Sequence, residues 1–294
     1  MPIHDLSYRH WDGHLKPYTS LRWWVITKAG LKHLAQRKFV RLIVAIPPAI
    51  YILAHGVWIY AADRIPQVRI SWPIDSRFFK DFILRIEPIP SGLLIGLLCV
   101  FGGASLIADD LKHNALQLYF SKPITWVDYL LGKLGVMVIL LSSMTLLPAM
   151  ILFIEHLLLV EDLTFIRENY WIIGSIFLYS LVVIIPSSLL IVTLSSLTSN
   201  TRYAAIGLGA ILIGTPLVYQ IIRQTTHSSE MAMISIWANY DILGSKLFGL
   251  RPGYASHWFW SLLTLVGMIS LCLWVLRYRI KAVQIVKRSV KHTA

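Results

Sequence analysis

Charged residues are scarce in this chain. Of its 294 residues, only 14% are Asp, Glu, Lys or Arg, whereas 56% are hydrophobic. Soluble domains carry about 25% charged residues. The composition therefore excludes one or two ordinary water-soluble domains and indicates a protein whose surroundings are largely lipid.

Cysteine is almost absent as well. Cys99 and Cys272 are the only two, and both lie inside apolar runs, where a thiol behaves as a small hydrophobic group. Two such residues exclude a disulfide framework and leave the redox compartment open.

Acidic residues are outnumbered by basic ones. The chain has 15 Asp and Glu against 27 Lys and Arg, which gives a formal net charge of +12. A nucleic-acid-binding protein would place such an excess on a polar surface with interleaved aromatic residues. Here the basic residues are confined to short segments between apolar runs, so the pattern indicates orientation in a membrane and argues against nucleic acid as a partner.

Long apolar runs are what the sequence has in abundance. Crossing a hydrocarbon core of about 30 Å takes about 20 helical residues, and six runs reach this length without Lys, Arg, Asp or Glu. The sequence therefore predicts an all-α integral membrane protein with six transmembrane helices. The six runs are Leu42–Ala62, Ile89–Ala108, Leu134–Ile154, Trp171–Leu194, Ala204–Ile222 and Trp258–Leu276.

Basic residues also predict which side each loop occupies. Six crossings place both termini on one side. The termini and loops on that side contain 18 Lys or Arg and 5 Asp or Glu, whereas the loops on the other side contain 9 Lys or Arg and 10 Asp or Glu. Because basic loops stay in the cytoplasm, we expect both termini to be cytoplasmic, in a plasma membrane such as the bacterial inner membrane. No cleavable signal peptide is visible before the first run.

These boundaries divide the chain into three regions. Residues 1–41 form a cytoplasmic N-terminal region, 42–276 the transmembrane domain and 277–294 a basic cytoplasmic tail. The six Lys and Arg of the tail predict a stop-transfer signal and an anchor to lipid headgroups.

The segment from 21 to 38 has an amphipathic pattern. A helical wheel separates an apolar arc from a basic arc, which is typical of an elbow helix lying in the headgroup layer. A basic juxtamembrane linker is the alternative, since apolar residues interrupt the basic arc. The apolar arc holds Trp23, Trp24, Leu31 and Leu34, and the basic arc holds Arg22, Lys28, Lys32 and Arg37.

Small residues and prolines predict helix contacts and kinks. Gly92 and Gly96 in the second run, and Gly209 and Gly214 in the fifth, belong to small-xxx-small patterns. Such patterns let helices approach closely, so we expect the second and fifth helices to contact others, within the chain or across a dimer. Proline lacks a backbone donor, which predicts kinks at Pro47, Pro48, Pro148, Pro186 and Pro216.

Patterns for catalysis and metal binding are missing. His4, His10 and His14 have a spacing that fits no standard zinc pattern. His55 is the only histidine well inside a run, and we expect it to be neutral and hydrogen-bonded in a structural role. The sequence therefore predicts no catalytic, cofactor-binding or metal-binding residue, and no enzyme.

Gly132-Lys133 is not a phosphate-binding loop. Such a loop requires a glycine at position 127, which is Val127, and a Ser or Thr at position 134, which is Leu134. We therefore expect no ATP hydrolysis by this chain alone.

The most informative segment, 109–133, joins the second and third runs. It begins with the cluster Asp109-Asp110-Leu111-Lys112, breaks at Ser121-Lys122-Pro123-Ile124 and ends in Tyr129-Leu130-Leu131-Gly132-Lys133. Pro123 ends the first piece, and Thr125 can cap a second helix. The pattern predicts a short helix at the membrane surface that another protein could bind.

This segment resembles the signature of membrane-spanning permease subunits of type-2 ABC exporters. In that family a charged cluster, a Leu-Ser-x-Pro-Ile break and a Tyr-Leu-Leu-Gly-Lys start of the third span follow one another. The chain departs at 114–117, where the family commonly has Gly-Thr and an acidic residue. The turn at 194–202 and the outer segment 237–243 are also similar to the family.

The resemblance implies an exporter permease with an elbow helix. It would pair with a second permease copy or a homologue and with separate ATPase subunits that hold ATP and magnesium. The segment 109–133 would carry a coupling helix that docks on the ATPase, and the second and fifth helices would line the path. Ile124, Trp126 and Tyr129 would form an apolar edge that protrudes toward the ATPase. The residues implied in coupling are Asp109, Asp110, Lys112, Ser121, Pro123, Ile124, Trp126 and Tyr129.

Two other classes stay open on the sequence. One is a non-transporting membrane anchor of an ATPase-containing complex, and the other is an intramembrane enzyme acting on lipid or glycan. The enzyme would need a group of carboxylate or histidine residues at one membrane face, where the sequence offers only scattered single ones. Uncharged spans permit a lipid, peptide, glycan or drug-like cargo.

Overall fold

The computed structural model describes residues 21–65, 67, 75–84, 91–121, 124–159, 163–226 and 230–290. In these ranges the regular structure is entirely helical. Six helical stretches are long and apolar enough to cross a membrane, which confirms the predicted number and the membrane-protein class. They run over Lys38–Ala62, Gly92–Lys112, Trp126–Leu159, Asn169–Leu197, Thr201–Thr226 and Trp258–Ile280.

Four of the six spans lie in one continuous helix each, and two are interrupted. The continuous ones are α2 (Lys38–Arg64), α10 (Leu163–Leu197), α11 (Thr201–Thr226) and α13 (Trp258–Val290). The second span comprises α5 (Ser91–Leu98), the π-helix η1 (Cys99–Gly103) and α6 (Ser105–Lys112), and the third comprises α8 (Trp126–Ser142) and α9 (Leu146–Leu159). Shorter elements are α1 (Arg22–Ala35), α4 (Ser76–Leu84), α7 (Ala115–Ser121), η2 (Glu230–Ile234) and α12 (Ile236–Leu247).

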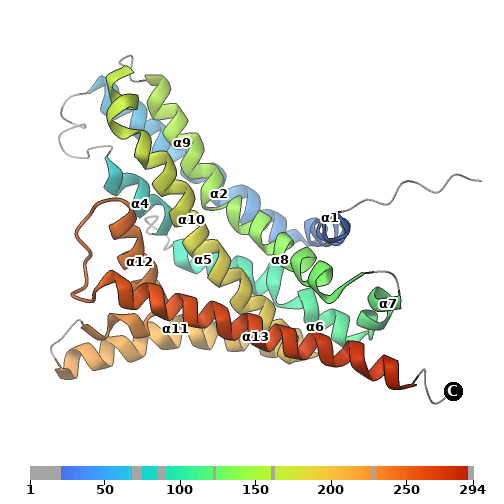
Figure 1. Cartoon of the computed structure of the whole chain (residues 1–294). Coiled ribbons are helices and arrows are strands. Elements are labelled where there is room, and N and C mark those ends of the chain that lie inside the picture. The colour runs from blue at the N-terminus through green and yellow to red at the C-terminus, as the bar shows by residue number, and fades with distance from the viewer. Residues whose placement is uncertain are drawn as a thin grey trace, which may run out of the picture.

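Helix α10 is the central element. It contacts α8, α9, α11 and α13, while α2 packs on α9 (Figure 1). The group formed by α2, α8, α9 and α10 lies close to α11 and α13 near α6 and separates from them toward α4 and α12. Helix α12 contacts α10, α11 and α13 at that open end. The spans therefore form a wedge whose wide end holds α12.

Burial separates inner spans from outer ones. In the most apolar window of each span, 72% of the residues are buried in the second and fourth spans, but only 11% in the fifth and 22% in the sixth. Apolar helices of such low burial need lipid or another protein around them. The outer faces of α11 and α13, together with that of α2, whose window is 28% buried, are thus apolar surfaces that this chain offers to its surroundings.

The π-helix lets the second span pack tightly against its neighbours. A Cβ atom on Gly103 would lie 2.7 Å from Cγ1 of Ile191, so only glycine fits there. Beyond it, the Oγ of Ser195 accepts hydrogen bonds from the backbone N–H groups of Ile107 (3.0 Å) and Ala108 (2.9 Å). Because the first N–H groups of a helix lack intrahelical partners, Ser195 on α10 completes the first turn of α6.

Helix α1 exists as the sequence predicts, but its buried face is different. Ile26 and Thr27 are buried with Leu34, whereas Trp24 is 44% exposed. The Oγ1 of Thr27 donates to the carbonyl of Gly132 on α8 at 3.0 Å. The face of α1 that packs on the protein therefore includes Ile26 and Thr27, whereas Trp24 of the apolar arc is exposed. The position of α1 in the headgroup layer stays a prediction.

The remaining residues of the predicted elbow surface keep their expected exposure. Lys28 and Lys32 are exposed, and Trp23 is half-buried beside Trp24, with ring centroids 5.8 Å apart in an edge-on arrangement. Lys28 and Lys32 thus lie where they can meet lipid headgroups or solvent.

The intramembrane histidine has the structural role that the sequence predicts. Nδ1 of His55 donates to the carbonyl of Tyr51, one turn earlier, at 3.0 Å. Its ring meets that of Phe82 edge-on, with centroids 5.3 Å apart. A ring satisfied by its own helix and surrounded by aromatic side chains is a packing element.

Candidate functional site

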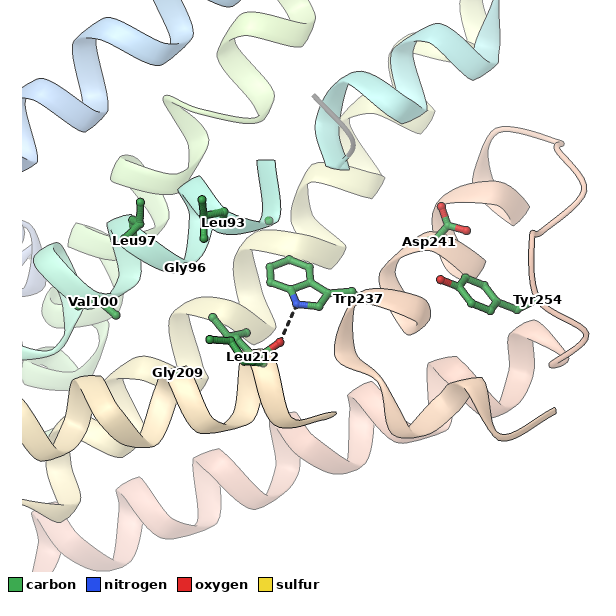
Figure 2. Close-up of a pocket in the computed structure, with 11 residues that line it drawn as sticks. Leu93, Gly96, Leu97, Val100, Gly209, Leu212, Trp237, Asp241 and Tyr254 are labelled. Carbon is green, nitrogen blue, oxygen red and sulfur yellow. Dashed lines mark hydrogen bonds between the residues drawn. The ribbon is translucent and has the colours of Figure 1, made fainter. Parts of the chain in front are cut away.

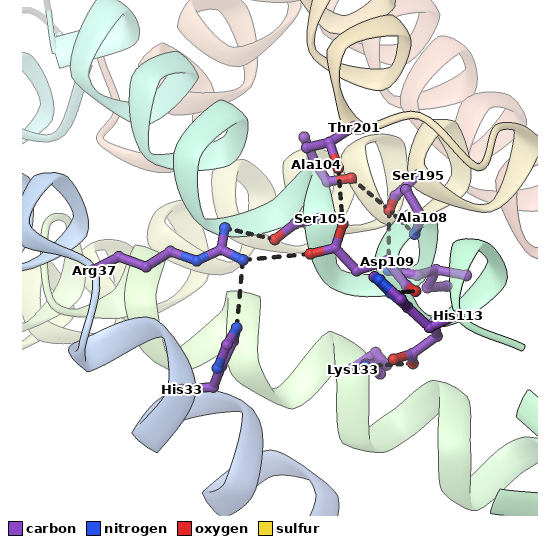
Figure 3. A network of polar contacts seen from close by, with 12 residues as sticks. His33, Arg37, Ala104, Ser105, Ala108, Asp109, His113, Lys133, Ser195 and Thr201 are labelled. Carbon is purple, nitrogen blue, oxygen red and sulfur yellow. Dashed lines mark hydrogen bonds and ion pairs between the residues drawn. The ribbon is translucent and has the colours of Figure 1, made fainter. Parts of the chain in front are cut away.

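A polar cluster at the end of α6 joins three helices. Asp109 accepts a hydrogen bond from Thr201 Oγ1 (3.0 Å) and pairs with the guanidinium of Arg37 (3.4 Å). Arg37 also donates to Ser105 Oγ at 2.8 Å (Figure 3). Thr201 is the first residue of α11, and Arg37 immediately precedes α2. Asp109 therefore fixes the starts of α2 and α11 to α6.

The neighbouring carboxylate ties α6 to α8. Nζ of Lys133 lies 2.6 Å from Asp110 Oδ2, and the hydroxyl of Tyr129 donates to the same oxygen at 2.6 Å. The ammonium also lies over the rings of Tyr119 and Tyr129, 5.7 and 5.5 Å from their centroids. A buried lysine needs such compensation. Burial and the negative charge of Asp110 together raise the pKa of Tyr119, so its phenol stays neutral.

These contacts correct part of the predicted coupling surface. Tyr129 is fully buried and cannot form a protruding edge, because its hydroxyl is held by Asp110 inside the protein. Ile124 and Trp126 are half-buried and pack against the core. Pro123 lies outside the described residues.

Helix α7 supplies the exposed surface instead. Leu118 is 68% exposed, and Lys112 and Ser121 are exposed on either side of it. The turn before α7 contains Asn114 at φ 52°, in the left-handed region that asparagine tolerates better than most residues. A short helix thus projects an apolar side chain where the sequence predicts a surface for another protein.

The start of α8 follows the sequence prediction in detail. Thr125 Oγ1 accepts from the backbone N–H of Asp128 at 3.2 Å, and the carboxylate of Asp128 accepts from the backbone N–H of Thr125 at 3.0 Å. This reciprocal pair is a capping box. It fixes the point at which the chain turns from the α7 segment into the third span.

A pocket of about 470 Å³ lies toward the other end of the molecule (Figure 2). It is bounded by α5 and η1 on one side, by α11 on another and by α12 and the following loop on the third. Most of its lining is aliphatic, and polar groups come from few residues. The residues that set its chemistry are Leu93, Leu97, Leu212, Trp237, Asp241 and Tyr254.

The four predicted small-residue positions have two different outcomes. A Cβ atom on Gly92 would lie 2.9 Å from the ring of Trp237, and one on Gly96 would lie 3.0 Å from Cδ1 of Leu212. The predicted close contacts are therefore confirmed in the second span. Around Gly209 and Gly214 nothing lies within 4 Å of such an atom. The fifth helix contacts others of the chain, but not at these two glycines, and Gly209 lines the pocket. A contact of these glycines across a dimer stays a prediction.

One hydrogen bond holds α12 against α11 near Pro216. The indole Nε1 of Trp237 donates to the carbonyl of Leu212 at 3.0 Å. In a regular helix that carbonyl would accept from the residue four positions later, which is Pro216 and has no N–H. Trp237 therefore replaces the donor that the proline removes, at the wall of the pocket.

A buried ion pair anchors α12 on its other side. Nζ of Lys80 on α4 lies 2.8 Å from Oδ1 of Asp241 on α12, and both side chains are buried. Sequence reasoning missed this pair, because the two residues are far apart in the chain and the resemblance of segment 237–243 gives no partner for Asp241. Tyr240 beside them shares a hydrogen bond of 3.0 Å with Ser187 Oγ, and burial raises its phenolic pKa.

No group of three or more His, Cys, Asp or Glu side chains within the described ranges could hold a metal ion. In comparison with known proteins, no protein-family model matches this chain, and no curated protein matches it either. The polar cluster at α6 and the pocket at α12 are therefore the two features on which a function can be based.

Proposed function

We propose that this chain is the permease subunit of an ABC exporter, with both termini cytoplasmic. It pairs with a second permease copy or a homologue and with separate ATPase subunits, which hold ATP and magnesium. One observation carries the proposal: Asp109 connects the segment bearing the exposed helix α7 to α11, the helix that lines the pocket.

The connection begins at α7. A partner that binds around Leu118 and moves α7 also moves α6, because only a tight turn at Asn114 separates them. Asp109 lies on α6 and carries the movement to Thr201 at the start of α11 and to Arg37 before α2. Hydrogen bonds to charged groups contribute about 1.5–3 kcal/mol each, at the lower end here because the Arg37 pair is partly exposed.

The middle of the same helix meets the cargo. Helix α11 forms one wall of the pocket through Gly209, Leu212 and Ile213, and α5 forms the wall facing it. A shift of α11 against α5 changes the distance between these walls. Rigid-body displacement of this kind is a common form of switching transition.

The lining of the pocket favours a cargo with a large apolar part. A volume of about 470 Å³ is in the usual range for sites that enclose small molecules, in which few polar groups fix the orientation. Here Tyr254 and Asp241 are the polar groups. Because Lys80 neutralises Asp241, a strongly charged head is not required of the cargo.

The outer face of α11 supports pairing of two permeases. Its exposed apolar side chains recur at intervals of three, four or seven residues, which is the spacing of a helix that packs along another helix. Lipid can also cover such a stripe, so the spacing supports pairing but does not require it. The stripe consists of Tyr203, Ile206, Ile213, Leu217 and Ile221.

Co-purification tests the partner. The tagged full-length chain, extracted from its own membrane in mild detergent, should bring down an ABC ATPase recognisable by mass spectrometry. Leu118→Gln should reduce its recovery at least several-fold. Leu158→Gln, at a residue of α9 that is 76% exposed, is the matched control and should leave recovery unchanged. Wild-type protein without an ATPase would disprove the proposal.

A measurement of α11 movement distinguishes a transporter from a non-transporting anchor. Spin labels at Leu93 on α5 and Ile213 on α11, both at the pocket, should report a changed distance when the complex is trapped with ATP and vanadate. An unchanged distance in an ATPase-containing complex would favour the non-transporting anchor.

A further inference from the structure

A second pocket, of about 310 Å³, lies at the end of the molecule that carries α6 and α7. It is formed between α6, α7, the end of α10 and α13. One side is apolar and the other bears hydroxyl groups and a guanidinium. Its characteristic residues are Leu111, Leu116, Ile280, Thr198, Ser199 and Arg279.

Arg279 has more N–H donors than its one hydrogen bond within the described residues uses. One of its terminal nitrogens donates to the carbonyl of Leu197 at 3.2 Å. Leu197 is the last residue of α10, where a carbonyl has no helical donor. A guanidinium carries five N–H groups, and within the described part of the chain no carboxylate forms an ion pair with Arg279. Its charge is therefore free to meet an anion at the pocket.

Aromatic residues on α13 place this pocket at the depth of lipid headgroups. Trp274 and Tyr278 are 66% and 71% exposed, and their rings stack with centroids 6.3 Å apart. Exposed Trp and Tyr mark the boundary between hydrocarbon and water. Arg279 follows directly and lies one residue before the end of the sixth span at Ile280.

We propose that this pocket binds one anionic glycerophospholipid. The phosphodiester accepts hydrogen bonds from the guanidinium of Arg279 and from the hydroxyl of Ser199, and the glycerol and first methylenes lie along Leu111, Leu116 and Ile280. Arginine suits this ligand because its planar N–H groups match two phosphate oxygens. Basic pockets between membrane helices are a recurrent site for anionic lipid headgroups.

The bound lipid would stabilise the position of α7. The pocket has walls on α6 and α7 and on α13, so one ligand would contact elements that are linked by few other contacts. The site does not depend on an ATPase or on transport, and its test is independent of the proposed function.

The test uses the purified full-length chain in an uncharged detergent. Dioleoyl phosphatidylglycerol should raise the midpoint of thermal unfolding, and dioleoyl phosphatidylcholine should not. Arg279→Gln should weaken the apparent affinity for phosphatidylglycerol about tenfold or more, as expected when one charge-assisted contact is lost. Arg277→Gln is the matched control, since Arg277 is exposed on the same helix but does not line the pocket.

A second pair of variants leaves Arg279 in place, so that its hydrogen bond to the carbonyl at the end of α10 is kept. Ser199→Asp places a carboxylate at the pocket while leaving the bond between Arg279 and Leu197 intact, and should abolish the response to phosphatidylglycerol. Ser199→Asn has a similar size without charge and should keep the response.

Three results would overturn the proposal. They are an equal response to both lipids, an equal loss with Arg277→Gln, or the same stabilisation by glycerol 3-phosphate alone, which would indicate a free anion and not a lipid.

Discussion

Trp237 and Leu212 form a side-chain substitute for a backbone hydrogen bond. The carbonyl of Leu212 faces Pro216, which has no N–H to offer, and the indole of Trp237 donates to it at 3.0 Å. The same ring lies so close to Gly92 of α5 that a Cβ atom there would be 2.9 Å from it. One side chain thus joins α12, α11 and α5 at the wall of the pocket.

The first prediction concerns this donor. Trp237→Phe keeps an aromatic ring but leaves the Leu212 carbonyl without its partner, which should cost about 1–3 kcal/mol of stability. Pro216→Ala restores a backbone N–H that can bond the same carbonyl. In the Pro216→Ala background the cost of Trp237→Phe should therefore be about 1 kcal/mol smaller, measured by unfolding in detergent. An equal cost in both backgrounds would show that the indole does not replace the missing donor.

A second prediction concerns the buried pair of Lys80 and Asp241. Asp241→Asn leaves the ammonium of Lys80 buried without its closest counter-charge, and breaking a buried pair from one side costs about 3–5 kcal/mol. We expect a loss at the lower end of this range, because Asp81 remains as a second counter-charge, with its Oδ1 3.8 Å from Lys80 Nζ. Unfolding of the purified variant in detergent measures the loss.

The double variant is the control for this pair. Lys80→Met with Asp241→Leu removes both charges at similar volume, and replacing a buried pair by apolar residues is often neutral or stabilising. It should therefore be more stable than Asp241→Asn. A double variant as unstable as the single one would mean that the two charges do not compensate each other.

The spans were predictable because the signal is local. A run of about 20 apolar residues without charge has one physical outcome in a membrane, and all six runs correspond to spans in the structure. The cap at Thr125 was also predictable, since its partner Asp128 lies only three residues later. The helix of the third span begins before the apolar run at Leu134, at Trp126, and includes Lys133, whose ammonium is paired with Asp110.

The pocket and the polar cluster were not predictable in detail. Asp109 and Asp110 were recognised as a charged pair, but their partners Arg37, Thr201 and Lys133 come from other helices. The inward position of Tyr129 follows from the same contacts. The sequence shows that Pro216 lacks an N–H group, yet the identity of the donor that replaces it depends on where α12 folds back. Such pairings depend on tertiary packing and have no signal in spacing.

A third prediction concerns topology and rests on the excess of Lys and Arg on one side. Gln117→Cys on α7 should react with a membrane-impermeant maleimide only after permeabilisation, whereas Gly253→Cys should react in intact cells. Nothing lies within 4 Å of a Cβ atom at Gly253, so the substitution fits, and the native Cys99 and Cys272 are buried and should stay unlabelled. The reverse pattern of labelling would disprove cytoplasmic termini.

The last prediction concerns the link between Asp109 and Thr201. Thr201→Val keeps the shape of the side chain but removes the hydroxyl that donates to Asp109 at 3.0 Å. Because neither residue belongs to the exposed helix α7, the variant should still recover the ATPase. The ATP-dependent change in distance between labels on α5 and α11 should shrink markedly, since α11 has lost one of its attachments to α6. Thr201→Ser retains the hydroxyl and should behave as wild type. If Thr201→Val moves as far as Thr201→Ser, this hydrogen bond holds the fold together without transmitting movement, and the path from α7 to the pocket must run through other contacts.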